Sequence, residues 1–450
     1  MPLSVDHRFP EPESIAAFKT WLTAHGACFH DHVRFVTNLS GYRIVAIEPL
    51  GPDTTIVTSP FALAITPSLS KNALVTVLRN EEIVRDWSER QLICSYICFH
   101  WILDPGRNHA LSHAPYLNTL PPPEQLRTPL HFTPTELEAL KGTNLHGATL
   151  DRRIEWRKEW SQCQQVIACI NTQWAESFTW ECYLTAATYL SSRAFPSTLL
   201  APTPSLVATS TSYPVLLPGV DALNHARAQP VSWVVSFPPP SASTNPSQEP
   251  TDPSMSTLTS SSVNEPTVSL VHHAPVPALS EIFNNYGPKP NAELILGYGF
   301  SLPDNPDDTI VLRIGSTGGD GKRWEVGRDA KGAEGVWDEL LQVIRACEDE
   351  EQDEIPGWSL ALDAAAALQS MTSSLIERLP SPHPAGVRSD VAPMINHYVV
   401  GQREVLEGLL RFAQKREEEA VLAAKREGVN VLVDEEPQGG LIGAAGSRVV

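Results

Sequence analysis

The sequence lacks a long apolar segment and an apolar leader. Its 450 residues contain no run of about 18 apolar residues, the length that crosses a bilayer. Residues 1–14 contain neither an apolar stretch of signal-peptide type nor a basic cluster. We therefore expect neither a membrane span nor secretion, and the predicted location is the cytoplasm or the nucleus.

Positive charge is also scarce. Lys and Arg number 33 against 52 Asp and Glu, which gives a net charge of −19. Nucleic-acid binding and docking on anionic lipid both depend on clustered Lys and Arg, so this balance argues against nucleic-acid and membrane partners. An acidic protein of this kind instead favours a basic partner.

Cysteines are few and follow no metal-binding pattern. The seven cysteines are scattered, and none forms a Cys-x-x-Cys pair or a Cys/His cluster with zinc spacing. We predict no metal site and a reducing compartment. Cys94 and Cys98 lie four residues apart in a segment of helical pattern, where core packing is favoured over metal or redox use.

Proline is abundant by contrast, with 39 residues, and one segment is rich in Pro, Ser and Thr together. Between Pro238 and Pro266, 19 of 29 residues are Pro, Ser or Thr, and large apolar side chains are almost absent. Such a composition cannot offset the entropy lost on ordering. We predict a disordered surface loop over 238–266.

Apolar patterns divide the rest of the chain into strands and helices, enough for two or three domains. A helical period holds from about 81 to 190, and a region of short strands runs from 215 to about 314. After Trp337 the period is helical again, with one apolar stripe at Met394, Tyr398, Val405, Leu409 and Phe412. In the N-terminal part, three runs broken by Gly and Pro predict strands, at Tyr42–Ile47, Thr55–Val57 and Phe61–Ile65.

Two motif-like stretches do not carry the chemistry that they suggest. In Gly315–Arg323, Ser316 stands where a phosphate loop requires its first Gly, and Arg323 stands where a magnesium-binding Ser or Thr belongs. This stretch predicts a turn between strands. The pair His272-His273 has no acidic or cysteine companions in its run, so packing is favoured over a metal site.

Two further segments are dense in polar and aromatic residues. Pro218–His225 reads Pro-Gly-Val-Asp-Ala-Leu-Asn-His, and Glu281–Phe300 contains Asn-Asn-Tyr-Gly and ends in Tyr-Gly-Phe. Taken singly, each is explained by helix capping and by tyrosines in the core. Both segments in this order are far more specific.

Together they resemble the SET-domain methyltransferases, in the branch of the plant Rubisco large-subunit lysine methyltransferase and the fungal ribosomal-protein and elongation-factor lysine methyltransferases. Ser192–Phe195, reading Ser-Arg-Ala-Phe, and Pro393–Phe412 are also similar to parts of that family. The resemblance implies an α+β protein. Its SET fold would have small β-sheets, a knot-like core and a helical insertion, followed by an all-α C-terminal substrate-binding domain.

The same resemblance implies domain limits. The SET domain would span 1–315 and a helical substrate-binding domain 330–425, before a flexible tail at 426–450. Within the SET domain, the N-terminal half, the helical insertion and the C-terminal half would cover about 25–80, 81–190 and 191–315.

The resemblance further implies S-adenosylmethionine-dependent methylation of a lysine on a non-histone protein, such as a ribosomal protein or translation factor. Tyr286 would be catalytic, without a metal. The residues implied to bind the cofactor are Gly41, Tyr42, Arg193, Asn224, His225 and Tyr286. Those implied to bind the substrate are Phe195, Asp221, Trp233 and Tyr298.

Three departures from the family pattern stand out, and one of them is the inserted loop at 238–266. Arg43 replaces a glycine near the cofactor and would be strained if that position required a positive φ. The glycine that normally precedes Glu281 is missing from Ala278–Glu281.

Two alternatives to lysine methylation stay open. One is a histidine methyltransferase of the same fold, and the other is a SET-fold module that binds a partner without catalysis. The histidine-modifying branch has Asn at the position of Phe195 and Trp at that of Val220. Apolar residues at both positions favour lysine, because neither can fix an imidazole tautomer.

Overall fold

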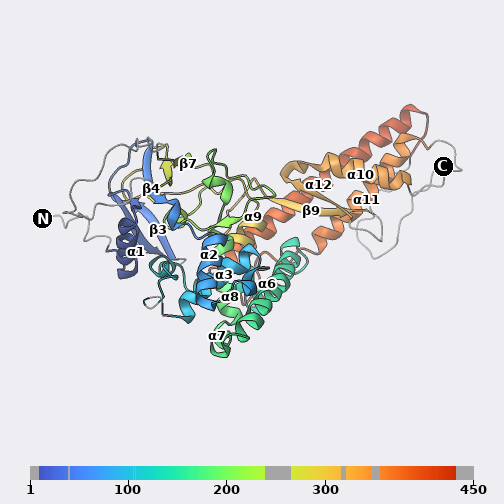
Figure 1. Cartoon of the computed structure of the whole chain (residues 1–450). Coiled ribbons are helices and arrows are strands. Elements are labelled where there is room, and N and C mark those ends of the chain that lie inside the picture. Colours follow the sequence, from blue (N-terminus) through green and yellow to red (C-terminus); the bar gives the residue numbers. More distant parts are fainter. Residues whose placement is uncertain are drawn as a thin grey trace, which may run out of the picture. The chain divides into compact units, whose positions relative to one another are not determined.

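The computed structural model describes residues 10–38, 41–104, 106, 108–238, 265–315, 321–346 and 355–431. The chain forms two compact units (Figure 1). The first comprises residues 1–130, 151–288 and 297–299, and the second comprises 131–150, 289–296 and 300–450. Most of the predicted loop, residues 239–264, lies outside the described residues, as does the tail from 432.

The first unit contains a four-stranded antiparallel sheet in the order β1-β4-β8-β7. Its central pair joins strands from opposite ends of the unit, and a hydrogen bond links Thr58 Oγ1 to Ser269 Oγ, 211 residues apart. Along β8, buried Val268, Leu270 and His272 alternate with less buried residues. The four strands are β1 (Cys28–Phe29), β4 (Thr54–Pro60), β8 (Thr267–His272) and β7 (Val231–Ser236).

The described part of this unit also contains two smaller antiparallel strand pairs. One pairs β2 (Val33–Asn38) with β3 (Gly41–Ala46), and the other pairs β5 (Phe195–Pro196) with β6 (Pro214–Val215). The predicted strands at Tyr42–Ile47 and Thr55–Val57 therefore exist as β3 and β4.

A predicted strand at Phe61–Ile65 is wrong. Phe61–Leu63 forms a 3₁₀ turn, and Ile65 makes only an isolated bridge to Leu216. The ladder of β4 runs through Pro60, which pairs with Thr267, and the chain then turns, with the Ala64 N–H donating to the Phe61 carbonyl at 2.9 Å.

Helices pack against the strands of the first unit. The helix α3 (Glu89–Ile102) begins with a capping box in which the side chains of Ser88 and Gln91 each accept a backbone N–H of the other residue. Its Cys94 and Cys98 are fully buried, so core packing is confirmed for this pair. The other helices here are α1 (Glu13–Ala24), α2 (Pro67–Leu78), α4 (Ala114–Leu117), α7 (Thr172–Ser177) and α8 (Trp180–Arg193), and α6 (Asn144–Ala168) joins both units.

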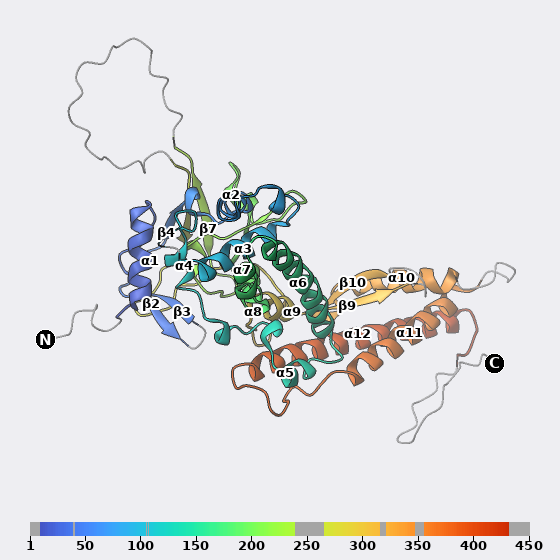
Figure 2. The same ribbon diagram turned by 60° about the horizontal axis from the view of Figure 1, so that its bottom comes forward.

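The second unit is mainly helical but includes a β-hairpin. The strands β9 (Thr309–Ile314) and β10 (Lys322–Gly327) pair in the antiparallel sense, as the predicted turn after Gly315 requires, although 316–320 lie outside the described residues. The long helix α12 (Ala392–Arg426) lies beside α11 (Gly357–Glu377) (Figure 2). The predicted apolar stripe of α12 is buried at Met394, Tyr398, Val405 and Leu409. Shorter helices are α5 (Pro134–Glu138), α9 (Asn291–Glu293) and α10 (Ala333–Ala346).

The compact units follow a different division from the predicted domain limits at 315 and 330. Segments 131–150 and 289–296 join the second unit because Leu140, Leu145 and Ile295 share an apolar cluster with residues of α12, among them Ile395 and Tyr398. Among the described residues, no helix is both long and apolar enough to cross a membrane.

Candidate functional site

The segment that carries Asp221, Asn224 and His225 begins with a turn at Gly219 that favours glycine. Gly219 has φ +89°, a conformation that favours glycine, and a Cβ there would meet the Phe29 and Val57 side chains at 3.4 Å. The chain then makes a 3₁₀ turn over Val220–Ala222. This turn buries Asp221, which is 6% exposed.

A second segment, more than 50 residues later, lies directly alongside the first. The backbone N–H of Asn284 donates to the Asn224 carbonyl at 2.7 Å, and the N–H of Ala226 donates to the Asn284 carbonyl at 3.0 Å. His225 and Asn284 thereby form a parallel bridge. The two segments that stood out in the sequence are therefore joined through their backbones.

Tyr286 stacks with two aromatic rings at this junction. Its ring stacks on His225 with centroids 5.0 Å apart and on Tyr298 with centroids 5.1 Å apart. The His225 Nδ1 accepts the backbone N–H of Tyr286 at 3.0 Å, and the Tyr286 hydroxyl donates to the Leu223 carbonyl at 2.8 Å. Burial raises the pKa of Tyr286, so its hydroxyl stays protonated near neutral pH.

Asn224 connects the junction to the N-terminal hairpin. Its Nδ2 donates to the Glu281 carboxylate at 2.8 Å and lies 3.4 Å from the Tyr42 carbonyl. Glu281 is a site residue that the sequence reasoning missed. A carboxylate 57 residues from its amide partner leaves no signal in spacing.

Gly41, rather than Arg43, has the positive φ of the hairpin, a conformation that glycine adopts without strain. Gly41 has φ +120°, and a Cβ there would come within 3.2 Å of the Pro121 Cγ. Arg43 lies in β3, is exposed and does not have a positive φ. The strain considered for Arg43 is therefore absent. A different residue is strained: Leu279, near the missing glycine, has φ +64° and is 55% exposed.

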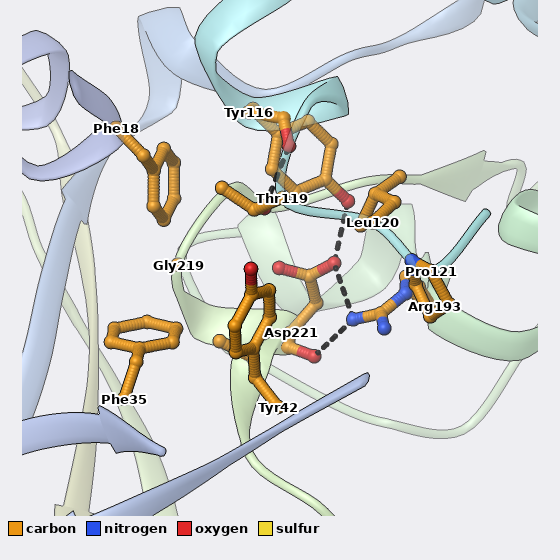
Figure 3. A pocket seen from close by; sticks show the side chains of 11 residues that line it. Phe18, Phe35, Tyr42, Tyr116, Thr119, Leu120, Pro121, Arg193, Gly219 and Asp221 are labelled. Carbon is orange, nitrogen blue, oxygen red and sulfur yellow. Dashed lines mark hydrogen bonds and ion pairs between the residues drawn. The ribbon is translucent and has the colours of Figure 1, made fainter. Parts of the chain in front are cut away.

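Arg193 and Asp221 form a buried ionic group beside a pocket (Figure 3). The Arg193 Nη1 donates to the Asp221 carbonyl at 3.2 Å and lies 3.6 Å from Asp221 Oδ2, which also accepts the Tyr116 hydroxyl at 2.5 Å. Burial raises the pKa of Asp221, against the lowering effect of Arg193. The pocket is lined by Phe18, Phe35, Tyr42, Tyr116, Thr119, Leu120, Pro121, Arg193, Gly219, Asp221 and Ala222.

Phe195 and Trp233 form an edge-to-face pair, with ring centroids 6.4 Å apart. Phe195 comes from β5 and Trp233 from β7, and both are half-buried. Val220 is fully buried.

The residues present fit the cofactor that the resemblance implies. The Oδ1 of Asp221 is buried and has no hydrogen-bond partner among the described residues, so this oxygen can still accept a hydrogen bond from a ligand. Arg193 offers a guanidinium suited to a carboxylate. Asn224 and the close backbone approach at Gly41 offer further polar contacts. Among the described residues, no cluster of three or more His, Cys, Asp or Glu could hold a metal ion.

Two curated fungal proteins are similar to this chain. The ribosomal lysine N-methyltransferase set10 of Schizosaccharomyces pombe is 29% identical over 296 residues, which cover 64% of this chain and 46% of that protein. The ribosomal lysine N-methyltransferase 1 of Saccharomyces cerevisiae is 26% identical over 44% of this chain and 34% of that protein. The chain thus matches less than half the length of either relative. No family model matches it.

Solved structures of Rubisco LSMT share the fold over nearly the whole chain. The SET domain of LSMT bound to lysine and AdoHcy has a TM-score of 0.67 at 17% identity and covers 91% of this chain and 93% of that one. Rubisco LSMT bound to AdoMet has a TM-score of 0.66 at 16% identity and covers 93% and 97%. The predicted α+β fold is confirmed.

Proposed function

We propose that this chain, which has the SET fold of Rubisco LSMT, is an S-adenosylmethionine-dependent protein-lysine methyltransferase. The observation that carries the proposal is Tyr286, stacked with His225 and Tyr298 and with its hydroxyl held by the Leu223 carbonyl. The two fungal relatives named as ribosomal lysine N-methyltransferases support the same reaction.

Cofactor binding is assigned to residues around the joined segments. When bound, S-adenosylmethionine supplies an activated methyl group on a sulfonium. Arg193 pairs with its carboxylate, because a guanidinium is a strong partner for that group. The remaining polar contacts come from Gly41, Tyr42, Asn224, His225 and Tyr286.

Tyr286 aligns the reacting groups rather than acting as a strong base. Its hydroxyl donates to the Leu223 carbonyl, so its oxygen is turned to accept a hydrogen bond from an incoming amine or a weak contact from a methyl group. Alignment of this kind can lower a barrier by several kcal/mol, up to about 7 to 11 in the ideal case. Stacking on His225 and Tyr298 holds the Tyr286 ring, and the bond to the Leu223 carbonyl orients its hydroxyl.

An apolar channel for the lysine is assigned to Phe195, Trp233 and Tyr298, with Asp221 as polar support. Apolar walls disfavour the ammonium form and lower the pKa of a lysine amine, which must be neutral to attack. They also match the four methylene groups of the side chain. Phe195 and Val220 offer no acceptor to orient an imidazole, which favours lysine over histidine as the target.

The substrate is proposed to be a non-histone protein with a basic surface, such as a ribosomal protein or a translation factor. The net charge of −19 and the printed names of the fungal relatives support this assignment. A substrate of this kind places the enzyme in the cytoplasm or the nucleus.

The test is methyl transfer to cell extract. The purified chain and labelled S-adenosylmethionine are incubated with extract from cells that lack the gene, and modified peptides are located by mass spectrometry. We expect methyllysine on a small number of proteins, and none with the Tyr286→Phe variant. Methylhistidine without methyllysine would select the histidine alternative, and cofactor binding without any product would select the non-catalytic one.

A further inference from the structure

Resting on the proposed function, we infer that Tyr116 is a positioning residue for the cofactor's amino-acid end. It acts through a chain of contacts in which the Tyr116 hydroxyl fixes Asp221 and Asp221 holds Arg193. Arg193 is the residue assigned to the cofactor carboxylate. Tyr116 itself lies one contact behind that residue.

The first contact of the chain fixes the Asp221 carboxylate. Tyr116 comes from α4, is 2% exposed, and packs against Phe18 with ring centroids 6.0 Å apart. Its hydroxyl donates to Asp221 Oδ2 at 2.5 Å, a short distance typical of a bond to a charged acceptor. A packed ring with one strong bond at its tip sets the rotation of the carboxylate.

The second contact fixes Arg193. This residue is the last of α8, and its Nη1 reaches Asp221 twice, at the main-chain carbonyl (3.2 Å) and towards Oδ2 (3.6 Å). Figure 3 shows the three side chains meeting at this carboxylate, with Oδ1 turned towards the pocket. The Asp221 main chain accepts the hydrogen bond of the guanidinium, and the Asp221 carboxylate adds an ion pair whose geometry depends on the rotation of that carboxylate.

The ionisation of Asp221 also links Tyr116 to Arg193. Burial raises the pKa of Asp221, whereas the charge of Arg193 and the hydrogen bond from Tyr116 lower it. Without the Tyr116 hydroxyl, the carboxylate loses the bond that helps to keep it ionised in this buried place. A neutral or rotated Asp221 releases Arg193 to other rotamers. The cofactor would then have to order Arg193 when it binds, at a cost in affinity.

The experiment compares two ligands on Tyr116→Phe by calorimetry. S-adenosylhomocysteine carries the amino-acid end, and 5′-methylthioadenosine lacks it. We expect the variant to weaken S-adenosylhomocysteine binding about three- to tenfold, the loss expected for one buried hydrogen bond, and to leave methylthioadenosine binding unchanged. In steady state the KM for S-adenosylmethionine should rise by the same factor, with kcat within about twofold.

The matched control is Tyr183→Phe. Tyr183 is also fully buried, and its hydroxyl also donates to a carboxylate, Glu159 at 3.1 Å, away from the pocket. This variant should leave both ligands unaffected. If Tyr116→Phe melts below the assay temperature, Asp221→Asn serves instead and should show the same difference between the ligands.

Three outcomes would overturn the inference. Equal weakening of both ligands would make Tyr116 a general structural residue, and unchanged binding of both would remove it from the chain of contacts. In either case binding of S-adenosylhomocysteine by the wild type leaves the proposed function standing. A wild-type protein that binds neither ligand would overturn the inference together with the proposed function.

Discussion

Buried Asp308 in the second unit and buried Asp221 in the first are hydrogen-bonded to different degrees. In the second unit, Asp308 Oδ1 accepts the backbone N–H of Asn291 at 2.7 Å, and its Oδ2 accepts the Asn291 side-chain amide at 3.1 Å. Arg328 lies 3.6 Å from the same Oδ2. In the first unit, Asp221 Oδ2 has two side-chain partners, whereas Oδ1 accepts no hydrogen bond of normal geometry among the described residues, although the nearby backbones of Gly219 and Asp221 lower the pKa of this carboxyl.

The difference separates a structural group from a binding group. Leaving a buried acceptor unpaired costs free energy, about 1 to 3 kcal/mol, so a fold normally pairs it. Asp308 is paired on both oxygens and holds the start of α9 beside β9. Asp221 keeps an acceptor unpaired at a pocket, which suits a group that gains a partner when a ligand binds.

The largest expected effect comes from a change at the reacting group itself. Tyr286→Phe removes one hydroxyl and leaves both stacking contacts intact. We expect methyl transfer to fall by at least about two orders of magnitude, the scale of one oriented polar group in a closed site. Thermal unfolding should be nearly unchanged. Activity within a few-fold of wild type would show that Tyr286 does not have this role.

A second test concerns His113 and His100, two buried histidines. Both ring nitrogens of each have polar partners, just as both carboxylate oxygens of Asp308 do. His113 contacts the Tyr96 hydroxyl at 2.6 Å and the Leu63 carbonyl at 3.2 Å, and the backbone N–H of His113 donates to His100 Nε2. Burial lowers the pKa of His113 to about 3 and that of His100 to about 4. Both are therefore neutral in the folded chain.

The sign of the pH dependence follows from these values. Below about pH 6.5 the histidines of the unfolded chain take up protons that the folded chain does not, so the free energy of unfolding falls as the pH drops from 6.5 to about 4 for His100 and to about 3 for His113. Above pH 6.5 the full contribution of both residues is present. The loss is on the order of 3 kcal/mol for His100 and about 5 kcal/mol for His113. Denaturant titrations should show a smaller loss in His113→Gln. The exposed residue His383, changed to Gln, is the control, and an equal reduction there would refute the assignment.

The comparison of carboxylates has its own test. Asp308→Asn at pH 7 removes the charge beside Arg328 and one acceptor for Asn291, and we expect a loss of about 2 kcal/mol in the free energy of unfolding. Cofactor binding should be unchanged. Asp221→Asn should do the reverse, with weaker cofactor binding and the smaller loss of stability. Equal effects of both variants on binding would remove the distinction.

The smallest expected effect is a gain in stability from a change at Leu279. Leu279 is held at φ +64°, which costs an L-residue about 1 to 2 kcal/mol, and its exposed side chain offsets little of that cost. Leu279→Gly should raise the free energy of unfolding by about 1 kcal/mol. Leu279→Ala keeps the strained φ and should not. A stabilising effect of Ala equal to that of Gly would trace the gain to the side chain instead.

Motif-bearing parts of the site could be predicted from the sequence because their chemistry lies in short, dense segments. The segments around His225 and Tyr286 are joined as that prediction requires, and Tyr298 stacks where an aromatic was expected. The individual roles of these residues stay predictions. The helices from 81 to 190 and the stripe of α12 followed from apolar period alone.

Other features depend on contacts that sequence spacing does not encode. Glu281 pairs with Asn224, and Tyr116 with Asp221, only because the fold brings distant segments together. The strand predicted at Phe61–Ile65 was wrong because that prediction used apolar content alone. The segment is as apolar as a strand but forms a 3₁₀ turn after Pro60. The positive φ lies at Gly41 and not at Arg43, because the backbone conformation of both residues depends on how the hairpin turn closes.

The pairing of β4 with β8 has a consequence for synthesis. Thr58 and Ser269 are 211 residues apart, so the centre of the sheet stays incomplete until the chain beyond β8 has left the ribosome. At a synthesis rate of about 5 to 20 residues per second, the side of β4 that pairs with β8 stays unpaired for on the order of 10 to 40 seconds. The joined segments around His225 and Tyr286 form later still. Newly made protein should therefore need a chaperone during this interval, and truncated chains that end before β8 should aggregate.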